Sequence, residues 1–154
     1  MAKIQMVAAC HKIAEHSTVA GVSDFEVEQL ADLMVDAYRG TTDWEDGDDE
    51  IVAAAEIRAT SAGRYGQFNV AASGVITDSN GLPVSALFVS HLDGLPTILF
   101  VYTAKSAAGE GHATTLIKRA AAVLVEQGHD EVVLYVSEEN PARMLYQKLG
   151  FERV

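Results

Sequence analysis

The sequence predicts a mixed α/β domain of the α+β type, in which an antiparallel meander of strands precedes a β–α–β unit. Two turn pairs, Asn80-Gly81 and Asp93-Gly94, separate apolar segments rich in Val, Ile, Leu and Phe. Such pairs are typical of hairpin turns, and the strands predicted beside them are residues 68–77, 83–91 and 97–103. A glycine turn then opens an amphipathic helix that leads to another apolar strand, so the last two strands should be parallel.

Length and composition favour one compact domain. The chain has 154 residues, 49% of them hydrophobic, and it contains no internal repeat, low-complexity tract or linker. The formal net charge of -11 argues against nucleic acid as a partner, because binding phosphates requires clustered Lys and Arg. The same charge is compatible with a cationic small molecule or a basic peptide as substrate. A single cysteine, Cys10, excludes an internal disulfide and points to a reducing compartment.

The segment before Cys10 resembles a bacterial lipoprotein cleavage site, V-A-A-C, and we reject that interpretation. Too few residues precede it for a charged region plus an apolar one, and Lys12 and Glu15 follow at once. No apolar run approaches the length of a membrane span. We therefore expect a cytoplasmic protein without a membrane partner.

The first third of the chain predicts two helices and a short strand. Residues 1–16 carry a weak helical pattern without an assigned role, so we treat them as an N-terminal extension of a domain that covers residues 17–154. Residues 16–22 predict a short strand through Val19. Ser23 and Glu26 have the spacing of a capping box, and the helix that follows should end near Arg39, before Gly40.

A strongly acidic loop is predicted at residues 41–50, followed by a second, Ala-rich helix at residues 51–62. One interpretation is a solvated loop whose charges also favour the next helix N-terminus. The other is a rim that attracts a cationic acceptor molecule. The acidic residues are Asp43, Glu45, Asp46, Asp48, Asp49 and Glu50.

The C-terminal third predicts a helix, a strand and a final helix. The first helix carries one apolar stripe and ends at Gly128, and residues 132–136 form the strand. Asn140 should cap the last helix with Pro141 at its first position, and Gly150 should end it, so that Phe151 packs back and begins another strand. The apolar stripe consists of Ala113, Leu116, Ile117, Ala120, Ala121 and Leu124, and the buried face of the last helix of Ala142, Leu145, Tyr146 and Leu149.

The stretch V-Y-T-A-K-S-A-A-G-E-G-H-A-T-T, residues 101–115, carries the strongest functional signal. Gly109 and Gly111 allow a ligand close to the backbone, and the unpaired N–H groups at a helix start suit a phosphate or pyrophosphate. No Lys follows either glycine, which excludes a P-loop. A dinucleotide fingerprint fails because Thr114 occupies its third glycine position and only one β–α unit is present. A tight turn without a ligand remains the alternative.

The order of elements and the segment E-N-P-A-R-M-L-Y-Q-K-L-G-F, residues 139–151, resemble the GNAT superfamily of acyl-CoA-dependent N-acyltransferases. The superfamily's pyrophosphate signature, [QR]-x-x-G-x-[GA], fits residues 106–111 except at its first position. Ser106 stands there, and Lys105 is a possible substitute for the missing side chain. The resemblance covers roughly residues 17–154.

The resemblance implies a mixed, twisted sheet with helices on both faces, in which strands 97–103 and 132–136 splay apart and hold acetyl-CoA between them. The backbone of Val101, Tyr102 and Thr103 would pair with the pantetheine arm. Asn140 and Tyr146 would contact the cofactor. The N–H groups that would hold the pyrophosphate belong to Gly109, Glu110, Gly111, His112, Ala113 and Thr114. Superfamily members usually continue beyond the point where this chain ends, so the sheet edge would be open or completed in a homodimer.

The implied reaction is direct transfer of the acyl group to a primary amine, with Tyr146 as the general acid for the thiolate. A base must deprotonate the amine, and the candidates are Glu56, which we prefer, Glu138 and Glu139. An N–H of the strand at residues 101–103 would hold the oxyanion. The five histidines show no metal-ligand spacing, so no metal is expected. Cys10 lacks a local signature for a nucleophile.

Two other function classes are compatible with the same residues. One is a non-catalytic module of this fold that binds or senses acyl-CoA. The other is a structural domain that binds no nucleotide. Neither the amine acceptor nor the acyl chain length can be read from the sequence.

Overall fold

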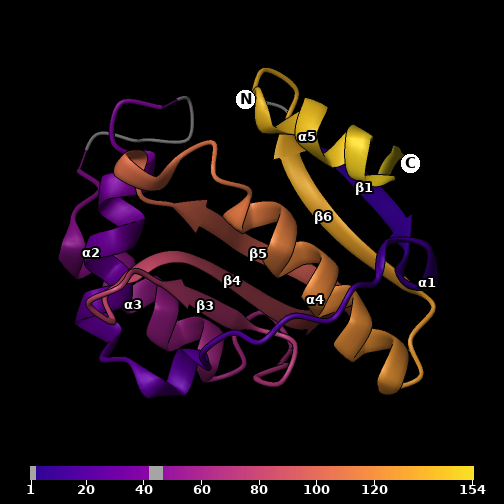
Figure 1. Cartoon of the computed structure of the whole chain (residues 1–154), viewed down its shortest axis with the longest axis horizontal. Helices are drawn as coiled ribbons and strands as arrows, with labels where there is room; N and C mark the ends of the chain where they lie inside the picture. The colour runs from indigo at the N-terminus through magenta and orange to yellow at the C-terminus, as the bar shows by residue number, and fades with distance from the viewer. Residues whose placement is uncertain (1–2, 42–46) are drawn as a thin grey trace.

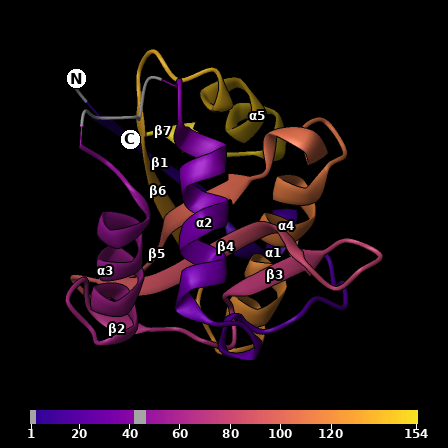
Figure 2. The same cartoon turned by 90° about the vertical axis from the view of Figure 1, so that its left-hand side faces the viewer.

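A computed structural model of the protein describes residues 3–41 and 47–154. In these ranges the chain forms one mixed sheet with helices on both faces (Figures 1 and 2). The strand order is β2-β4-β5-β6-β1-β7, and β3 pairs with β4 beside β2. The strands are β1 (Lys3–Ala9), β2 (Gln67–Phe68), β3 (Gly74–Thr77), β4 (Pro83–Leu92), β5 (Leu95–Thr103), β6 (Glu131–Ser137) and β7 (Glu152–Arg153).

The helices divide the core into two layers, one on each face of the sheet. On one face α4 and α5 cover a cluster that includes Met6, Leu87 and Ile117, and α1 packs beside α4. On the other face α2 and α3 cover the meander strands through Leu30, Ile57 and Phe88. The helices are α1 (Cys10–Ile13), α2 (Val27–Tyr38), α3 (Glu50–Ser61), α4 (His112–Glu126) and α5 (Ala142–Leu149), with 3-10 turns at Val22–Asp24 and Lys105–Ala107.

The predicted meander is confirmed, and its last strand parts from β6 as the resemblance implies. β3, β4 and β5 pair antiparallel in sequence, whereas β5 and β6 pair in parallel only at Thr97–Val133 and Ile98–Leu134. The register of β4 and β5 shifts at this point, because Val89 faces Ile98 while Phe88 faces Phe100. The extra residue is a β-bulge, which bends a strand and increases its twist. The bulge therefore turns β5 away from β6, and the two strands separate toward their ends (Figure 1).

The helical prediction for residues 1–16 is wrong, because Lys3–Ala9 is a strand inside the sheet. β1 pairs with β6 along its whole length and with β7 on its other edge. Ile4, Met6 and Ala8 are buried, and the residues between them are more exposed, which is the period of two expected for a strand. Only the next segment, Cys10–Ile13, is helical.

Three further expectations about the first half need correction. The strand predicted at residues 16–22 is reduced to a single bridge between Ala20 and Val75. The strand predicted at residues 68–77 is interrupted, because the side chain of Asn69 accepts a hydrogen bond from the N–H of Ala72 and turns the chain between β2 and β3. The capping box predicted from Ser23 to Glu26 is replaced by hydrogen bonds from Gly21 N–H to Asp24 and from Glu26 N–H to Gln29.

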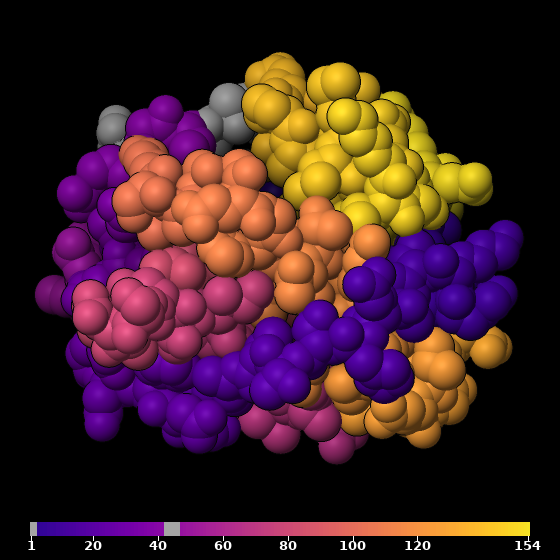
Figure 3. All heavy atoms as spheres, in the orientation of Figure 1, coloured from indigo at the N-terminus to yellow at the C-terminus, as the bar shows by residue number. Residues whose placement is uncertain are grey.

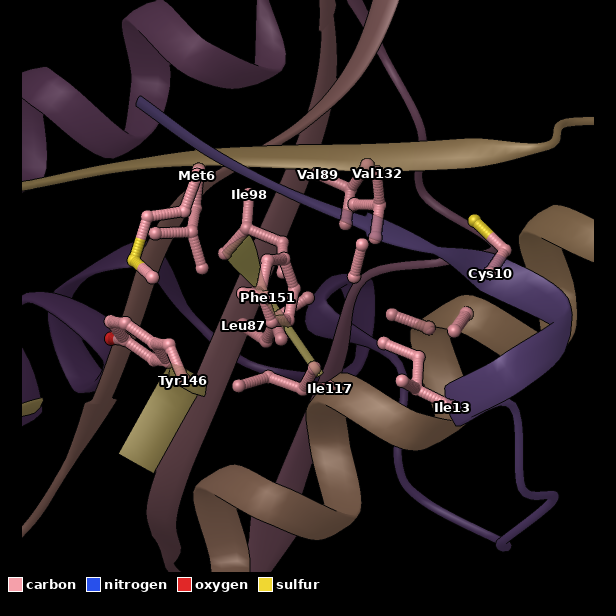
Figure 4. Close-up of a cluster of buried hydrophobic side chains, with 14 of the residues drawn as sticks. Met6, Cys10, Ile13, Leu87, Val89, Ile98, Ile117, Val132, Tyr146 and Phe151 are labelled. Atoms are coloured by element: carbon pink, nitrogen blue, oxygen red, sulfur yellow. The ribbon is translucent and has the colours of Figure 1, made fainter. Parts of the chain in front are cut away.

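The C-terminal third follows the prediction closely. Asn140 Oδ1 accepts a hydrogen bond from Ala142 N–H (2.9 Å), and α5 ends at Gly150, whose φ is +121°. Phe151 packs back into the core, with its ring 6.1 Å from that of Tyr146 (Figure 4). The chain then forms β7, which pairs with β1 at the edge of the sheet.

Candidate active site

The separation of β5 and β6 opens a cleft of about 890 Å³. Its floor and sides come from β5 residues 98–103 and β6 residues 134–137, together with the start of α5. On the surface, the molecule is hollowed between the orange segment that contains the glycine turn and the yellow α5 (Figure 3). The structure thus provides the opening between strands that the GNAT resemblance implies.

The cleft reaches both faces of the sheet, and each face contributes one predicted catalytic residue. Tyr146, from α5, packs in the core layer beneath α4 and α5 and lines the cleft from that side. Glu56, from α3, lines it from the side covered by α2 and α3. Tyr135 on β6 lines the cleft as well, and it alternates with the buried Leu134 and Val136, so its ring points to the face of Glu56. A reaction between groups that approach from opposite faces could therefore take place in the gap.

The backbone of β5 has one edge committed to β4 and one edge facing the gap. The N–H of Ala104 donates to the carbonyl of Val84 (2.8 Å), and the antiparallel register places Tyr102 opposite Ala86. Because backbone groups alternate between the two edges of a strand, those of Tyr102 point to β4 and those of Val101 and Thr103 point to the gap. Of the three residues predicted to pair with pantetheine, Val101 and Thr103 thus have the suitable orientation.

The side chain of Tyr102 has a structural role on the opposite face. Its hydroxyl donates to the carbonyl of Leu30 in α2 (3.0 Å), and burial raises its pKa well above the usual value. The ring stacks on Phe88 at 6.2 Å between centroids. Tyr102 therefore ties α2 to the strand that forms one side of the cleft.

The glycine turn has left-handed backbone and open space at both of its glycines. Gly109 and Gly111 have φ values of +81° and +82°, and a Cβ on either would have no atom within 4 Å. The first hydrogen bond of α4 runs from Thr115 N–H to Gly111 C=O (3.0 Å), so the N–H groups of residues 112–114 lie ahead of the helical ladder. Ala113 and Thr114 are part of this first turn.

Four polar side chains lie on or beside the glycine turn, those of Lys105, Ser106, Glu110 and His112. Glu110 is exposed and lies 3.4 Å from His112, which is the first residue of α4. Ser106 is exposed. The Nζ of Lys105, the suggested substitute, instead donates to the carbonyl of Arg39 at the end of α2.

Tyr146 is buried, and its ring sits at the edge of the core layer. Figure 4 shows its phenol oxygen directed away from Phe151 and Ile117. Asn140 and Ala142 line the same cleft, at the start of the helix that carries Tyr146. The structure therefore brings Tyr146 and Asn140 together beside the gap.

Glu56 has a partner that the sequence did not reveal. The hydroxyl of Tyr65 lies 2.5 Å from Oε1 and 2.9 Å from Oε2 of Glu56. This hydrogen bond, together with burial, raises the pKa of Tyr65. The two residues are nine positions apart across the end of α3, a spacing that follows no helical or strand period, so no sequence pattern could have paired them.

The other carboxylates considered for catalysis are less suitably placed. Glu138 forms an ion pair with Arg153 (2.9 Å), and Glu139 is exposed. Asp49 caps α3 by accepting from Val52 N–H (2.9 Å), as the solvated-loop interpretation expects, yet both Asp48 and Asp49 line the cleft. Three further acidic residues of this loop, Asp43, Glu45 and Asp46, lie outside the described residues.

The structure offers no metal site or activated cysteine in the ranges it describes. Within residues 3–41 and 47–154, no three His, Cys, Asp or Glu side chains gather to hold a metal ion. Cys10 is buried, and desolvation followed by the charge of Asp130 raises its pKa to about 11, so the thiol stays protonated at neutral pH. None of the described helices has the length and hydrophobicity needed to cross a bilayer.

Comparison with known proteins identifies the same half of the chain as the sequence motifs. The family model of the FR47-like protein matches residues 86–154, from β4 to the end of the chain. No curated protein matches the sequence. The structural comparisons extend over almost the whole chain.

Several solved structures share this fold at low sequence identity. The GCN5-related N-acetyltransferase from Sphaerobacter thermophilus aligns with a TM-score of 0.72 at 16% identity, over 99% of this chain and 48% of that one. Its counterpart from Kribbella flavida gives 0.58 at 18% identity, over 99% and 55%. A transcriptional regulator from Bacillus halodurans C-125 gives 0.64 at 20%, over 89% and 93%. The chain thus spans about half the length of the first two.

Proposed function

Because the chain has the fold of the GNAT superfamily, as its motifs predict, we propose that it is an acyltransferase that moves an acetyl or other acyl group from acyl-CoA to a primary amine. The observation that carries the proposal is the cleft between β5 and β6, lined by Tyr146 on one face and Glu56 on the other. The fold by itself would not specify the chemistry. The proposal therefore depends on these residues and their geometry.

Two backbone features support binding of acetyl-CoA. The gap-facing groups of Val101 and Thr103 would pair with the pantetheine arm as an added strand would. The N–H groups of residues 109–114 would hold the pyrophosphate at the start of α4. Each hydrogen bond to a charged oxygen contributes about 1.5–3 kcal/mol. Repulsion from the acidic protein is weaker, because charges beyond about 8 Å are largely screened at physiological salt.

The chemistry begins with the amine, which is mostly protonated at neutral pH. Freeing its lone pair costs roughly 4–5 kcal/mol for a lysine-like pKa near 10.4. The carboxylate of Glu56 would accept this proton, and the neutral nitrogen would attack the thioester carbon. A gap-facing N–H near Val101 would hold the oxyanion.

The tetrahedral intermediate would then collapse with cleavage of its C–S bond. The hydroxyl of Tyr146 would give a proton to the departing thiolate, and the nitrogen would lose its second proton to become an amide. The ammonium form thus supplies two protons, of which one ends on the CoA thiol and one in water. Tyr146 recovers its own proton from the medium.

The acceptor is proposed to be a cationic small molecule or a peptide amine. Asp48, Asp49 and Glu56 line the cleft on the side of α3, where we place the acceptor. Among the described residues that line the cleft, Lys3 carries a positive charge. The runner-up proposal is a non-catalytic module that binds or senses acyl-CoA with the same cleft. This module would make the same contacts with acyl-CoA as the proposed enzyme and would differ from it only in not turning over.

Two measurements test the proposal in order. Acetyl-CoA at about 100 times its Kd should raise stability by about 2.7 kcal/mol, seen as a higher Tm. Release of free CoA is then followed with a panel of polyamines, aminoglycosides, amino acids and peptide N-termini. A Tm shift with amine-dependent CoA release supports the enzyme. If acetyl-CoA raises the Tm but none of the amines causes release of CoA, the result supports the binding module. If acetyl-CoA leaves the Tm unchanged, both the enzyme and the binding module are refuted.

A further inference from the structure

Tyr65 and Glu56 form a hydrogen bond between the turn that follows α3 and the body of that helix. The O–H of Tyr65 is within 2.5 Å of one carboxylate oxygen and 2.9 Å of the other. An O–H donated to a carboxylate at this distance is a charge-assisted hydrogen bond, roughly twice as strong as a neutral one. The contact therefore constrains the side chain of Glu56.

The segment that carries Tyr65 is a tight turn with little freedom. Gly63 N–H donates to Thr60 C=O (3.1 Å), and Arg64 N–H to Ala59 C=O (3.0 Å), so the turn is bonded to the end of α3. At Gly66, φ is +94°, and a Cβ would come within 2.2 Å of the carbonyl oxygen of His91. Only glycine fits there, and the backbone lies directly against β4. The backbone on both sides of Tyr65 is thus held in place, before it by α3 and after it by β4.

Glu56 extends from the body of α3, which packs on the sheet. Ala53, Ile57 and Thr60 of this helix are buried against the meander. A free Glu side chain samples many rotamers, and ordering it costs conformational entropy. The hydroxyl of Tyr65 offsets this cost before a substrate arrives. Asp49, which lines the same side of the cleft, is instead committed to capping its helix.

We propose that Tyr65 is a positioning residue that holds the carboxylate of Glu56 in place for deprotonation of the acceptor amine. The inference rests on the proposed acyl transfer and deepens it, because it adds a residue that lies outside the cleft lining. Tyr65 itself touches neither substrate. It acts through the geometry of Glu56, since a base must lie within hydrogen-bond reach of the proton it removes.

Other charged groups lie near the Tyr65–Glu56 pair. Asp48, Asp49 and Lys3 line the cleft beside Glu56, and the guanidinium of Arg64 lies 5.6 Å from the centre of the Tyr65 ring. Arg64 therefore offers a control on the same turn, because Arg64→Ala removes a charge and keeps the hydroxyl.

The first test measures the hydrogen bond in solution and requires no acceptor. The phenolate absorbance of the wild type minus that of Tyr65→Phe isolates the ionisation of Tyr65. Loss of the carboxylate in Glu56→Gln should move this ionisation to lower pH, because the bond to Glu56 is the first cause of the raised pKa of Tyr65. An unchanged midpoint in Glu56→Gln would refute the proposed contact.

The second test measures turnover with acetyl-CoA and the best amine of the panel. Tyr65→Phe should lower kcat about tenfold, which is less than the 10²–10⁴-fold that a general base contributes, because Glu56 itself is kept. The KM for acetyl-CoA should stay constant, and the pH dependence of kcat should change on its acidic side. Arg64→Ala should keep wild-type turnover within about twofold.

The outcomes separate the two proposals. Equal kcat values in Tyr65→Phe and Arg64→Ala overturn the positioning role while leaving acyl transfer intact. A loss in Tyr65→Phe with full activity in Glu56→Gln also overturns it, because Tyr65 would then act without Glu56. Absence of CoA release with every amine refutes acyl transfer, and the absorbance titration still decides whether Tyr65 holds Glu56.

Discussion

At the scale of single residues, catalysis as proposed depends on two hydroxyl groups with different environments. Tyr146 is buried on the face of α4 and α5, whereas Tyr65 is partly exposed beside α3. The sequence could suggest Tyr146, because it lies in a motif segment. It could not suggest Tyr65, whose partner is set by the turn after α3 and by the approach of Gly66 to His91.

The first prediction concerns Tyr146. Tyr146→Phe keeps the ring against Phe151 and removes the proton proposed for the thiolate. We expect kcat to fall more than tenfold, while the affinity for acetyl-CoA, measured by isothermal titration, changes little. Turnover at the wild-type level would remove Tyr146 from the mechanism.

At the scale of elements, the sequence correctly predicted the turns, caps and helices that are determined by residues close together in the chain. The Asn80-Gly81 hairpin, the stripe of α4 and the cap at Asn140 all appear where the sequence places them. The N-terminal strand was missed, although Ile4, Met6 and Ala8 alternate correctly, because Ile4, Val7 and Ala8 also fit a helix. The choice between the two is made by β6, which lies more than 120 residues later in the chain.

The splay of β5 and β6 illustrates the same limit at the candidate site. The resemblance implied it, and the structure attributes it to the bulge where Val89 faces Ile98 and Phe88 faces Phe100. No residue of this stretch is a glycine or proline, so the bulge has no local signature. It emerges from the register between strands.

The second prediction tests the glycine turn against the other end of the same helix. Gly111 and Gly128 flank α4, have φ values of +82° and +89°, and a Cβ at either would have no atom within 4 Å. An alanine at each site should therefore cost a similar 1–2 kcal/mol through its left-handed conformation. Only Gly111→Ala should weaken acetyl-CoA binding, by about tenfold or more, because its methyl would occupy the space proposed for the diphosphate.

Calorimetric titration of the two variants with acetyl-CoA checks this expectation. Urea unfolding of each variant supplies the comparison of stability. Equal affinities in Gly111→Ala and Gly128→Ala would place the diphosphate elsewhere.

At the scale of the whole molecule, a polar network ties three distant segments at the end of the sheet away from the cleft. Asn69 Oδ1 accepts from Ala72 N–H (3.0 Å), which fixes the amide so that its Nδ2 faces Nε2 of His91 (3.0 Å) and Oε1 of Gln127 (2.7 Å). The Nε2 of His91 must therefore accept a hydrogen bond from Asn69, so that nitrogen carries no proton and the ring is neutral. The ring of His129 lies 5.0 Å from that of His91.

The third prediction follows from this network. Burial, and then the charge of His129, lowers the pKa of His91 below its usual value near 6.5. The unfolded chain then binds more protons than the folded one in mildly acidic solution, so stability is full above about pH 6.5 and declines as the pH falls below it. Tm measured from pH 8 to pH 5 should decline in the wild type.

Two substitutions isolate the contribution of His91. His91→Gln can still offer an acceptor to Asn69 and does not titrate, so its Tm should depend less on pH. His11→Gln, at an exposed position, should retain the wild-type dependence. Identical pH profiles for the wild type and His91→Gln would show that the network does not sense protonation.

The position of β1 has a consequence for how the protein is made. β1 is synthesised before both of its neighbours, β6 and β7, which lie more than 120 residues later in the chain. Contacts so distant in sequence form slowly, because the intervening chain must be closed into a loop first. The nascent chain must therefore carry Ile4, Met6 and Ala8 uncovered until β6 has been synthesised, which makes this short segment a target for chaperones during synthesis.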